Sequence, residues 1–300
     1  MRTEQLQRRV SALPLPPRLP PVGAVWRHKS AAVGLVLVSL VVLAALLAPW
    51  LAPYDPNAQD IMQNLRPPFW AGGDMEHPLG TDALGRDIWS RILFGARVSL
   101  AIALCAVAVQ GSVGTILGLL AGYFKGRTDL YVMRLADLQL SVPPLVLAIG
   151  VIAVLGPSLT NIILILGLTG WPYYGRLVRS EVLSVRERDF VMAARALGAS
   201  DPGILRRHIF PNVTTSLTVA ATFAVPLMII QEASLSFLGL GVPPSVPTWG
   251  AMIADGRDLL STAGWIAALP GMAIFATVVG VNLLGDWLRD VLDPSLRHRG

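Results

Sequence analysis

The sequence predicts an all-α polytopic membrane protein with six transmembrane helices. Of its 300 residues, 53% are hydrophobic and 14% are charged, whereas a soluble globular domain carries about 25% charged residues. A membrane-spanning helix needs about 20 mostly apolar residues. Six segments meet that need: 31–52, 99–122, 131–156, 158–177, 214–238 and 262–286.

The first apolar segment is predicted to be an uncleaved anchor. Its run from Ala31 to Leu51 is longer than the roughly 7–15 residues of a signal-peptide core, and 30 residues precede it. The net charge of +5 comes almost wholly from arginine. Because basic and aromatic residues do not alternate on a polar domain, we expect this charge to face anionic lipid, and we expect no nucleic-acid partner.

The distribution of arginine predicts that both termini are cytoplasmic. Lys and Arg collect on the cytoplasmic side, and segment 176–207 holds seven arginines against four acids, while segment 53–98 is acidic. The expected parts are a cytoplasmic N-terminal segment (1–30), a first transmembrane helix (31–52), an extracytoplasmic segment with an interfacial helix (53–98), a five-helix core (99–288) and a cytoplasmic tail (289–300).

The expected interfacial helix lies in "ALGRDIWSRILFGA", residues 83–96. Its apolar residues recur every four positions, as an amphipathic helix requires. Trp89 is the expected interface anchor. Asp87 and Arg91 are spaced to pair on the other face.

The inner segment 190–212 predicts a helix–turn–helix at the cytoplasmic surface. "VMAARAL" favours a helix that Gly198 can end, and Ser200 or Asp201 can cap a second helix that Pro211 stops. Leu205 and Ile209 are four residues apart and are predicted to form an apolar knob flanked by arginines. The alternative is a solvated cytoplasmic loop whose arginines reflect only the enrichment of Lys and Arg on the cytoplasmic side.

This segment resembles the EAA loop of ABC-importer permeases. Ala193, Ala194, Gly198, Phe210 and Pro211 fit the family spacing, whereas Met192 replaces the usual glutamate. Three further stretches resemble the peptide/nickel branch of that family: "HPLGTDALGRDIWSRILFGARVSL", "EASLSFLGLGVPPSVPTWGAMI" and "NLLGDWLRDVLDP". Within this branch, the chain is most similar to the C-type dipeptide permeases.

The resemblance implies a permease subunit that docks on an ATPase and is not itself an enzyme. Its expected partners are a homologous second permease, two ATP-binding cassette ATPase subunits, an extracytoplasmic solute-binding protein and the lipid bilayer. No lysine lies in a P-loop pattern, so ATP and Mg should be bound by the ATPases, with no cofactor or metal in this chain. The residues expected to contact the ATPase are Ala193, Ala194, Gly198, Asp201, Leu205, Arg206, Arg207 and Pro211.

Polar residues inside apolar segments are candidates for the substrate pathway, because they are costly in a membrane. A buried carboxylate could meet the ammonium group of a peptide. The alternative is hydrogen bonding between helices. The candidates are Asp137, Gln139, Asn161, Gln231, Glu232 and Asn282.

Glycines and prolines predict how the helices pack and bend. Gly114, Gly118 and Gly122 form a stripe that admits another helix closely, either of this chain or of a partner permease. Pro143–Pro144, Pro172 and Pro226 should kink their helices. Di- or oligopeptides are the expected cargo, with nickel chelates, glutathione or another small solute as alternatives. A stand-alone ion-coupled secondary transporter is the competing class.

Overall fold

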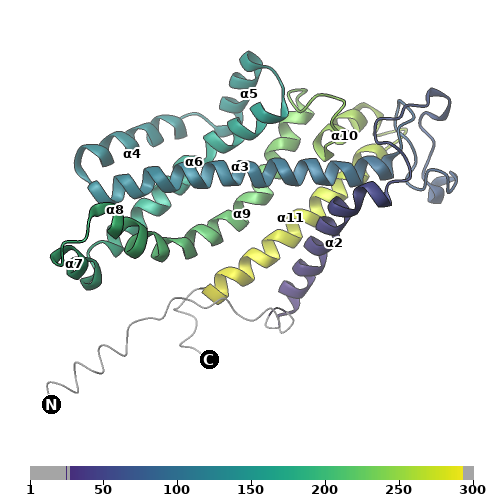
Figure 1. Cartoon of the computed structure of the whole chain (residues 1–300). Coiled ribbons are helices and arrows are strands. Elements are labelled where there is room, and N and C mark those ends of the chain that lie inside the picture. Colours follow the sequence, from purple (N-terminus) through teal and green to yellow (C-terminus); the bar gives the residue numbers. More distant parts are fainter. Residues whose placement is uncertain (1–24, 26–27, 293–300) are drawn as a thin grey trace.

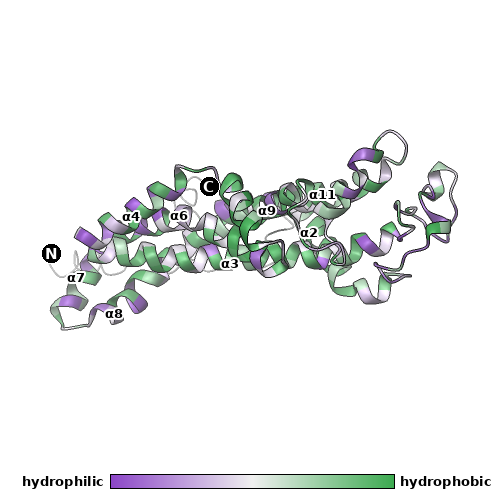
Figure 2. Ribbon diagram, turned by 90° about the horizontal axis from the view of Figure 1, so that it is seen from above, coloured by the Kyte–Doolittle hydropathy of each residue, from purple (hydrophilic) through white to green (hydrophobic). Residues whose placement is uncertain are grey.

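The computed structural model describes residue 25 and residues 28–292, and this part of the chain is an all-helical bundle (Figure 1). Five long helices form it: α2 (Lys29–Leu51), α3 (Ile88–Phe124), α6 (Leu159–Val185), α9 (Phe210–Phe237) and α11 (Trp265–Leu292). Hydrophobic residues dominate the middle of the bundle, and hydrophilic residues gather toward its ends (Figure 2). The predicted segment 1–30 and tail 289–300 lie mostly outside the described residues, so the side on which the termini lie stays a prediction.

Shorter helices connect the long ones. They are η2 (Ile61–Gln63), η3 (Phe69–Ala71), α4 (Gly126–Leu140), α5 (Pro144–Leu155), α7 (Asp189–Ala196), α8 (Asp201–Ile204), η4 (Leu205–Ile209), α10 (Trp249–Gly256) and η5 (Arg257–Leu259).

Four helical stretches in the described residues are long and apolar enough to cross a membrane. They are α2, α3, α11 and the stretch Asp201–Phe237, and the pair α4–α5 would make a fifth. The predicted span 158–177 lies in α6, which is 27 residues long but is not among these stretches. The count of six spans therefore stays a prediction.

The predicted span 131–156 is not one helix. It is divided between α4 and α5, whose axes are bent by 84°. Pro143 and Pro144 lie at the break, and Pro144 begins α5. Proline lacks an N–H and disfavours helix in the residue before it, so two in succession end α4 and start α5 in a new direction.

The core is built on the contact between α3 and α6. A Cβ atom added to Gly118 would lie 2.6 Å from the backbone oxygen of Gly175, and one added to Gly122 would lie 2.8 Å from Cβ of Val182. The glycine stripe of α3 therefore brings the two backbones close together. Of the two predicted partners for this stripe, the chain's own helix is the one observed.

The predicted interfacial helix is the first part of α3, which continues without a break to Phe124. The carboxylate of Asp87 caps the start of α3 by accepting from the backbone N–H of Ser90 at 2.8 Å. The predicted Asp87–Arg91 pair is wrong, because Asp87 bonds His77 and Arg91 pairs with Asp82. Trp89 lies where α3 meets the end of α2, and its indole N–H donates to the carbonyl of Leu51; its role as an interface anchor stays a prediction.

Candidate functional site

The inner loop 190–212 lies at one end of the bundle, where α7 and α8 protrude (Figure 1). Gly198 ends α7 with φ of +82°, a left-handed conformation in which a side chain is strained. The N–H of Ala199 donates to the carbonyl of Ala194 at 3.0 Å, as in a glycine C-cap. The chain therefore reverses sharply between α7 and α8.

The second helix of the loop does not stop at Pro211, contrary to the sequence-based expectation. Residues 205–209 form the π-helical turn η4, and the helix continues directly into α9. A proline removes one backbone donor, and the side chain of Asn212 supplies a donor to the carbonyl of His208 at 2.7 Å. Movement of α8 is thus continuous with movement of α9.

The apolar face of the loop turns inward rather than forming the predicted exposed knob. Ile204 and Ile209 are fully buried against Val178, Val182 and Val185 of α6, and Leu205 packs partly against the same cluster. Hydrophobic burial holds the loop on its own bundle.

The outward face of the loop carries most of the residues expected to contact an ATPase. Ala193, Gly198, Asp201, Arg206, Arg207 and Pro211 are exposed, and Ala194 and Leu205 are half-buried. Sequence reasoning missed two exposed apolar side chains on this face: Leu197 is 88% exposed and Met192 is 50% exposed. In the sequence, these two apolar residues flank the alanines of "VMAARAL". The helix-forming tendency of that segment seemed to explain them, so they were not recognised as a contact surface.

Tyr123, near the end of α3, joins three parts of the inner region. Its hydroxyl donates to Oδ1 of Asp201 at 2.5 Å and accepts from Arg195 at 3.3 Å. The guanidinium of Arg186 lies 5.8 Å from the centroid of its ring and donates to the backbone oxygen of Gly122 at 3.3 Å. Sequence reasoning missed Tyr123, because no local pattern links residue 123 to residue 201.

A second contact ties the end of α3 to the turn before α7. Lys125 donates to the carboxylate of Glu187 at 3.0 Å. This hydrogen bond and the lysine charge hold the pKa of Glu187 below its ordinary value. The pair is exposed, so its contribution to stability is small.

Three predicted pathway residues instead link or cap helices. Asp137 pairs with Arg176 at 2.5 Å. Gln139 donates to the backbone oxygens of Leu168 and Thr169 and accepts from Trp171 at 2.8 Å. Asn161 donates to the carbonyl of Gly156 at 2.9 Å. These contacts support the predicted alternative, hydrogen bonding within the bundle.

The other three predicted pathway residues do not converge on one cavity. Glu232 is 1% exposed and accepts from Ser236 at 2.8 Å, while its Oε2 has no partner among the described residues. Gln231 and Asn282 are half-buried on α9 and α11. The structure therefore does not bring the six candidates together.

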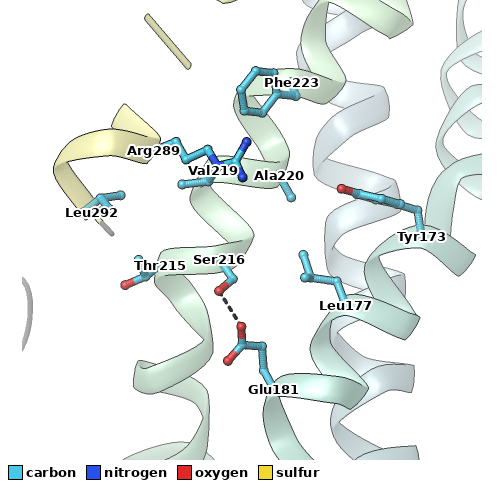
Figure 3. Close-up of a pocket in the computed structure, with 10 residues that line it drawn as sticks. All are labelled: Tyr173, Leu177, Glu181, Thr215, Ser216, Val219, Ala220, Phe223, Arg289 and Leu292. Atoms are coloured by element: carbon cyan, nitrogen blue, oxygen red, sulfur yellow. Dashed lines mark hydrogen bonds between the residues drawn. The ribbon is translucent and has the colours of Figure 1, made fainter. Parts of the chain in front are cut away.

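A cavity of about 590 Å³ lies between α6, α9 and the end of α11 (Figure 3). Glu181 and Arg289 line it together with the apolar side chains of Leu177, Val219 and Phe223. None of the six predicted pathway residues is among its lining residues. Its position was not predictable, because it joins residues more than 100 positions apart in the sequence.

A buried ionic cluster fixes the opposite end of the bundle. Asp82 accepts from Nε of Arg86 at 2.6 Å and also from Arg91, and Arg86 reaches Asp255 of α10 at 3.0 Å. Nδ1 of His77 lies 2.9 Å from Asp87. Paired buried charges of this kind fix one arrangement of a loop, because removal of a partner is costly. No group of three metal-ligating side chains occurs in the part of the chain that the structure describes.

Comparison with known families identifies two matching regions. Residues 114–298 match the family described as "Binding-protein-dependent transport system inner membrane component". Residues 25–68 match the "N-terminal TM domain of oligopeptide transport permease C".

Individual relatives match almost the whole chain. It is 45% identical over 274 residues to a "putative peptide transport system permease protein" of Brucella abortus biovar 1 (strain 9-941), covering 91% of this chain and 90% of the relative. It is 42% identical over 283 residues to the "di/tripeptide transport system permease protein DppC" of Pseudomonas aeruginosa (strain UCBPP-PA14), covering 93% of each.

A solved structure shares the fold. A chain of the MetNI methionine ABC transporter in an inward-facing conformation superposes with a TM-score of 0.55 at 19% identity. The match covers 67% of this chain and 96% of that chain.

Proposed function

Since this chain belongs to the family of binding-protein-dependent transport system inner membrane components, we propose that it forms half of a translocation pathway for di- or oligopeptides. It is a multi-pass inner-membrane permease subunit of an ABC importer. Relatives named as peptide and di/tripeptide transport permeases support a peptide cargo. Nickel chelates, glutathione or another small solute are the alternatives, and receptor-binding assays with each cargo distinguish them.

The complete importer combines this chain with a homologous second permease, two ATPase subunits and an extracytoplasmic solute-binding protein. The ATPases hold ATP and Mg, and this chain hydrolyses no ATP itself. Each inner loop docks on one ATPase, and the acidic outer segment at the opposite end faces the solute-binding protein. Closure of the ATPases on ATP moves the two inner loops together, which shifts the bundle between inward and outward access.

One observation carries this proposal: the inner loop exposes a basic outer face while its inner face is fixed to α3 and α6. The buried contacts of Ile204 and Ile209 and the hydrogen bonds of Tyr123 make the loop a rigid extension of both helices. A force applied to the exposed face therefore reaches the membrane helices. A stand-alone secondary transporter has no use for such a rigid basic extension.

The test is co-purification of the ATPases with variants of the exposed face. Deletion of the loop would expose the valine cluster of α6, so charge reversal is the better perturbation. The double variant Arg206→Glu, Arg207→Glu should insert normally but retain far less ATPase and transport. Arg134→Glu, an exposed arginine of α4 outside the loop, is the matched control. Recovery of no ATPase with the wild-type chain would contradict the proposal.

A further inference from the structure

The cavity between α6, α9 and α11 lies at the end of the bundle that carries the inner loop. Glu181 is one turn from the end of α6, Ser216 is in the second turn of α9, and Arg289 is in the last turn of α11. Its volume of about 590 Å³ falls in the range of small-molecule binding sites. A small solute leaving the bundle on this side has room to bind here.

Two opposite charges line this cavity from different helices. Glu181 comes from α6 and Arg289 from α11 (Figure 3). Glu181 accepts a hydrogen bond from the hydroxyl of Ser216 at 2.8 Å. Among the described residues, neither Glu181 nor Arg289 forms an ion pair, so no described charged side chain competes there with a ligand group of opposite sign.

Apolar side chains line the cavity between the two charges, beside the hydroxyl groups of Thr215 and Ser216. Val219 and Ala220 of α9 line the cavity near Arg289, and Leu177 of α6 lies on the side of Glu181 (Figure 3). A ligand that matches this pattern has a cation at one end, an anion at the other and a short apolar part between them. A short zwitterionic peptide has this arrangement, and its termini need charged partners when they leave water.

The other acids of the bundle do not offer the same possibility. Asp137 is paired with Arg176 and does not line this cavity, and the buried carboxylate of Glu232 accepts from Ser236 and does not line it either. Glu181 therefore replaces both as the carboxylate that can meet an ammonium group.

We infer that this cavity binds short peptides at the inner side of the pathway, with Glu181 accepting hydrogen bonds from the peptide ammonium group and Arg289 donating to its carboxylate. The inference rests on the proposed function and adds a site to it. Arg289 suits a carboxylate because its planar guanidinium can donate two parallel hydrogen bonds.

The test combines changes in the ligand with changes in the protein. Binding of Ala-Ala, N-acetyl-Ala-Ala and Ala-Ala amide is measured by equilibrium dialysis on the nucleotide-free complex of permeases and ATPases, without the solute-binding protein. Loss of a charge-assisted hydrogen bond should weaken binding about ten-fold. Acetylation should therefore weaken binding to the wild type but not to Glu181→Gln, and amidation should weaken binding to the wild type but not to Arg289→Gln.

Three variants separate this role from a structural one. Asp290→Asn and Arg134→Gln remove exposed charges outside the cavity and should bind all three peptides like the wild type. Ser216→Ala removes the hydrogen bond to Glu181 but leaves its carboxylate, and should retain the preference for a free ammonium group. Equal effects of acetylation and amidation on wild type and variants, or no binding of Ala-Ala at millimolar concentration, would overturn the inference.

Transport distinguishes this failure from failure of the proposed function. ATP-dependent uptake of Ala-Ala by the complete importer in proteoliposomes is measured in parallel. If the wild type imports Ala-Ala but does not bind it in this cavity, only the site is wrong. If it neither imports nor binds Ala-Ala, both proposals are wrong.

Discussion

Substitution Tyr123→Phe tests whether the inner loop is mechanically joined to α3. The change removes only the hydroxyl, so the ring still lies beside Arg186. It breaks the 2.5 Å hydrogen bond to Asp201 and the 3.3 Å bond from Arg195. Asp201 is exposed and water can replace the lost partner, so the expected cost is the lower end of a charged hydrogen bond, about 1.5 kcal/mol.

That free energy corresponds to about a ten-fold rise in the population of loops detached from α3. Hydrogen exchange should detect it as faster exchange of the amides of α8 and η4, with α6 unchanged. In the reconstituted importer, the amount of peptide transported per ATP hydrolysed should fall, because part of the ATPase movement no longer reaches α3. Tyr131→Phe is the control, since Tyr131 is 70% exposed on α4. Unchanged exchange and an unchanged transport ratio would refute the reasoning.

Two further substitutions test the packing of the bundle. Asp82→Asn removes the carboxylate shared by buried Arg86 and Arg91 and should destabilise the bundle by about 3 kcal/mol. The purified complex should then have a lower apparent melting temperature, whereas the exposed control Asp258→Asn should leave that temperature unchanged. Equal stability of the two variants would contradict the role of the cluster. Gly118→Val places side-chain atoms against the backbone of α6 and should lower the stability of the bundle by about 1–3 kcal/mol. In the control Gly271→Ala, the added methyl group meets open space and stability should not change. If the valine is tolerated, α3 and α6 can separate.

Composition and periodicity predicted the all-helical class and the positions of the apolar segments, because hydrophobic length is a local property. They failed where structure depends on the path of the backbone. The two prolines at 143 and 144 were expected to kink one helix but divide it at 84°. Pro211 was expected to end a helix, but it follows the π-helical turn 205–209 and lies in the first turn of α9, which continues past it. The consequence of a proline depends on which neighbours can replace its lost donor.

The candidate site was predictable only in part for the same reason. The spacing of Ala193, Ala194, Gly198 and Pro211 is continuous in the sequence and could be recognised there. The contacts of Tyr123 with residue 201, and of Glu181 with Ser216, join distant positions. The apolar face of Leu205 and Ile209 was correctly periodic, but periodicity does not state whether a face meets a partner or the chain itself.

The length of α3 has a mechanical consequence. Its 37 residues span about 55 Å, whereas the hydrocarbon core of a bilayer is about 30 Å thick. The helix is thus longer than the hydrocarbon core is thick, with the Asp82 cluster at one tip and Tyr123 near the other. A tilt of about 10° around its midpoint would displace each tip by about 5 Å in opposite directions. In the proposed importer, such a lever would link the side that meets the solute-binding protein directly to the side that meets the ATPases, within one continuous helix.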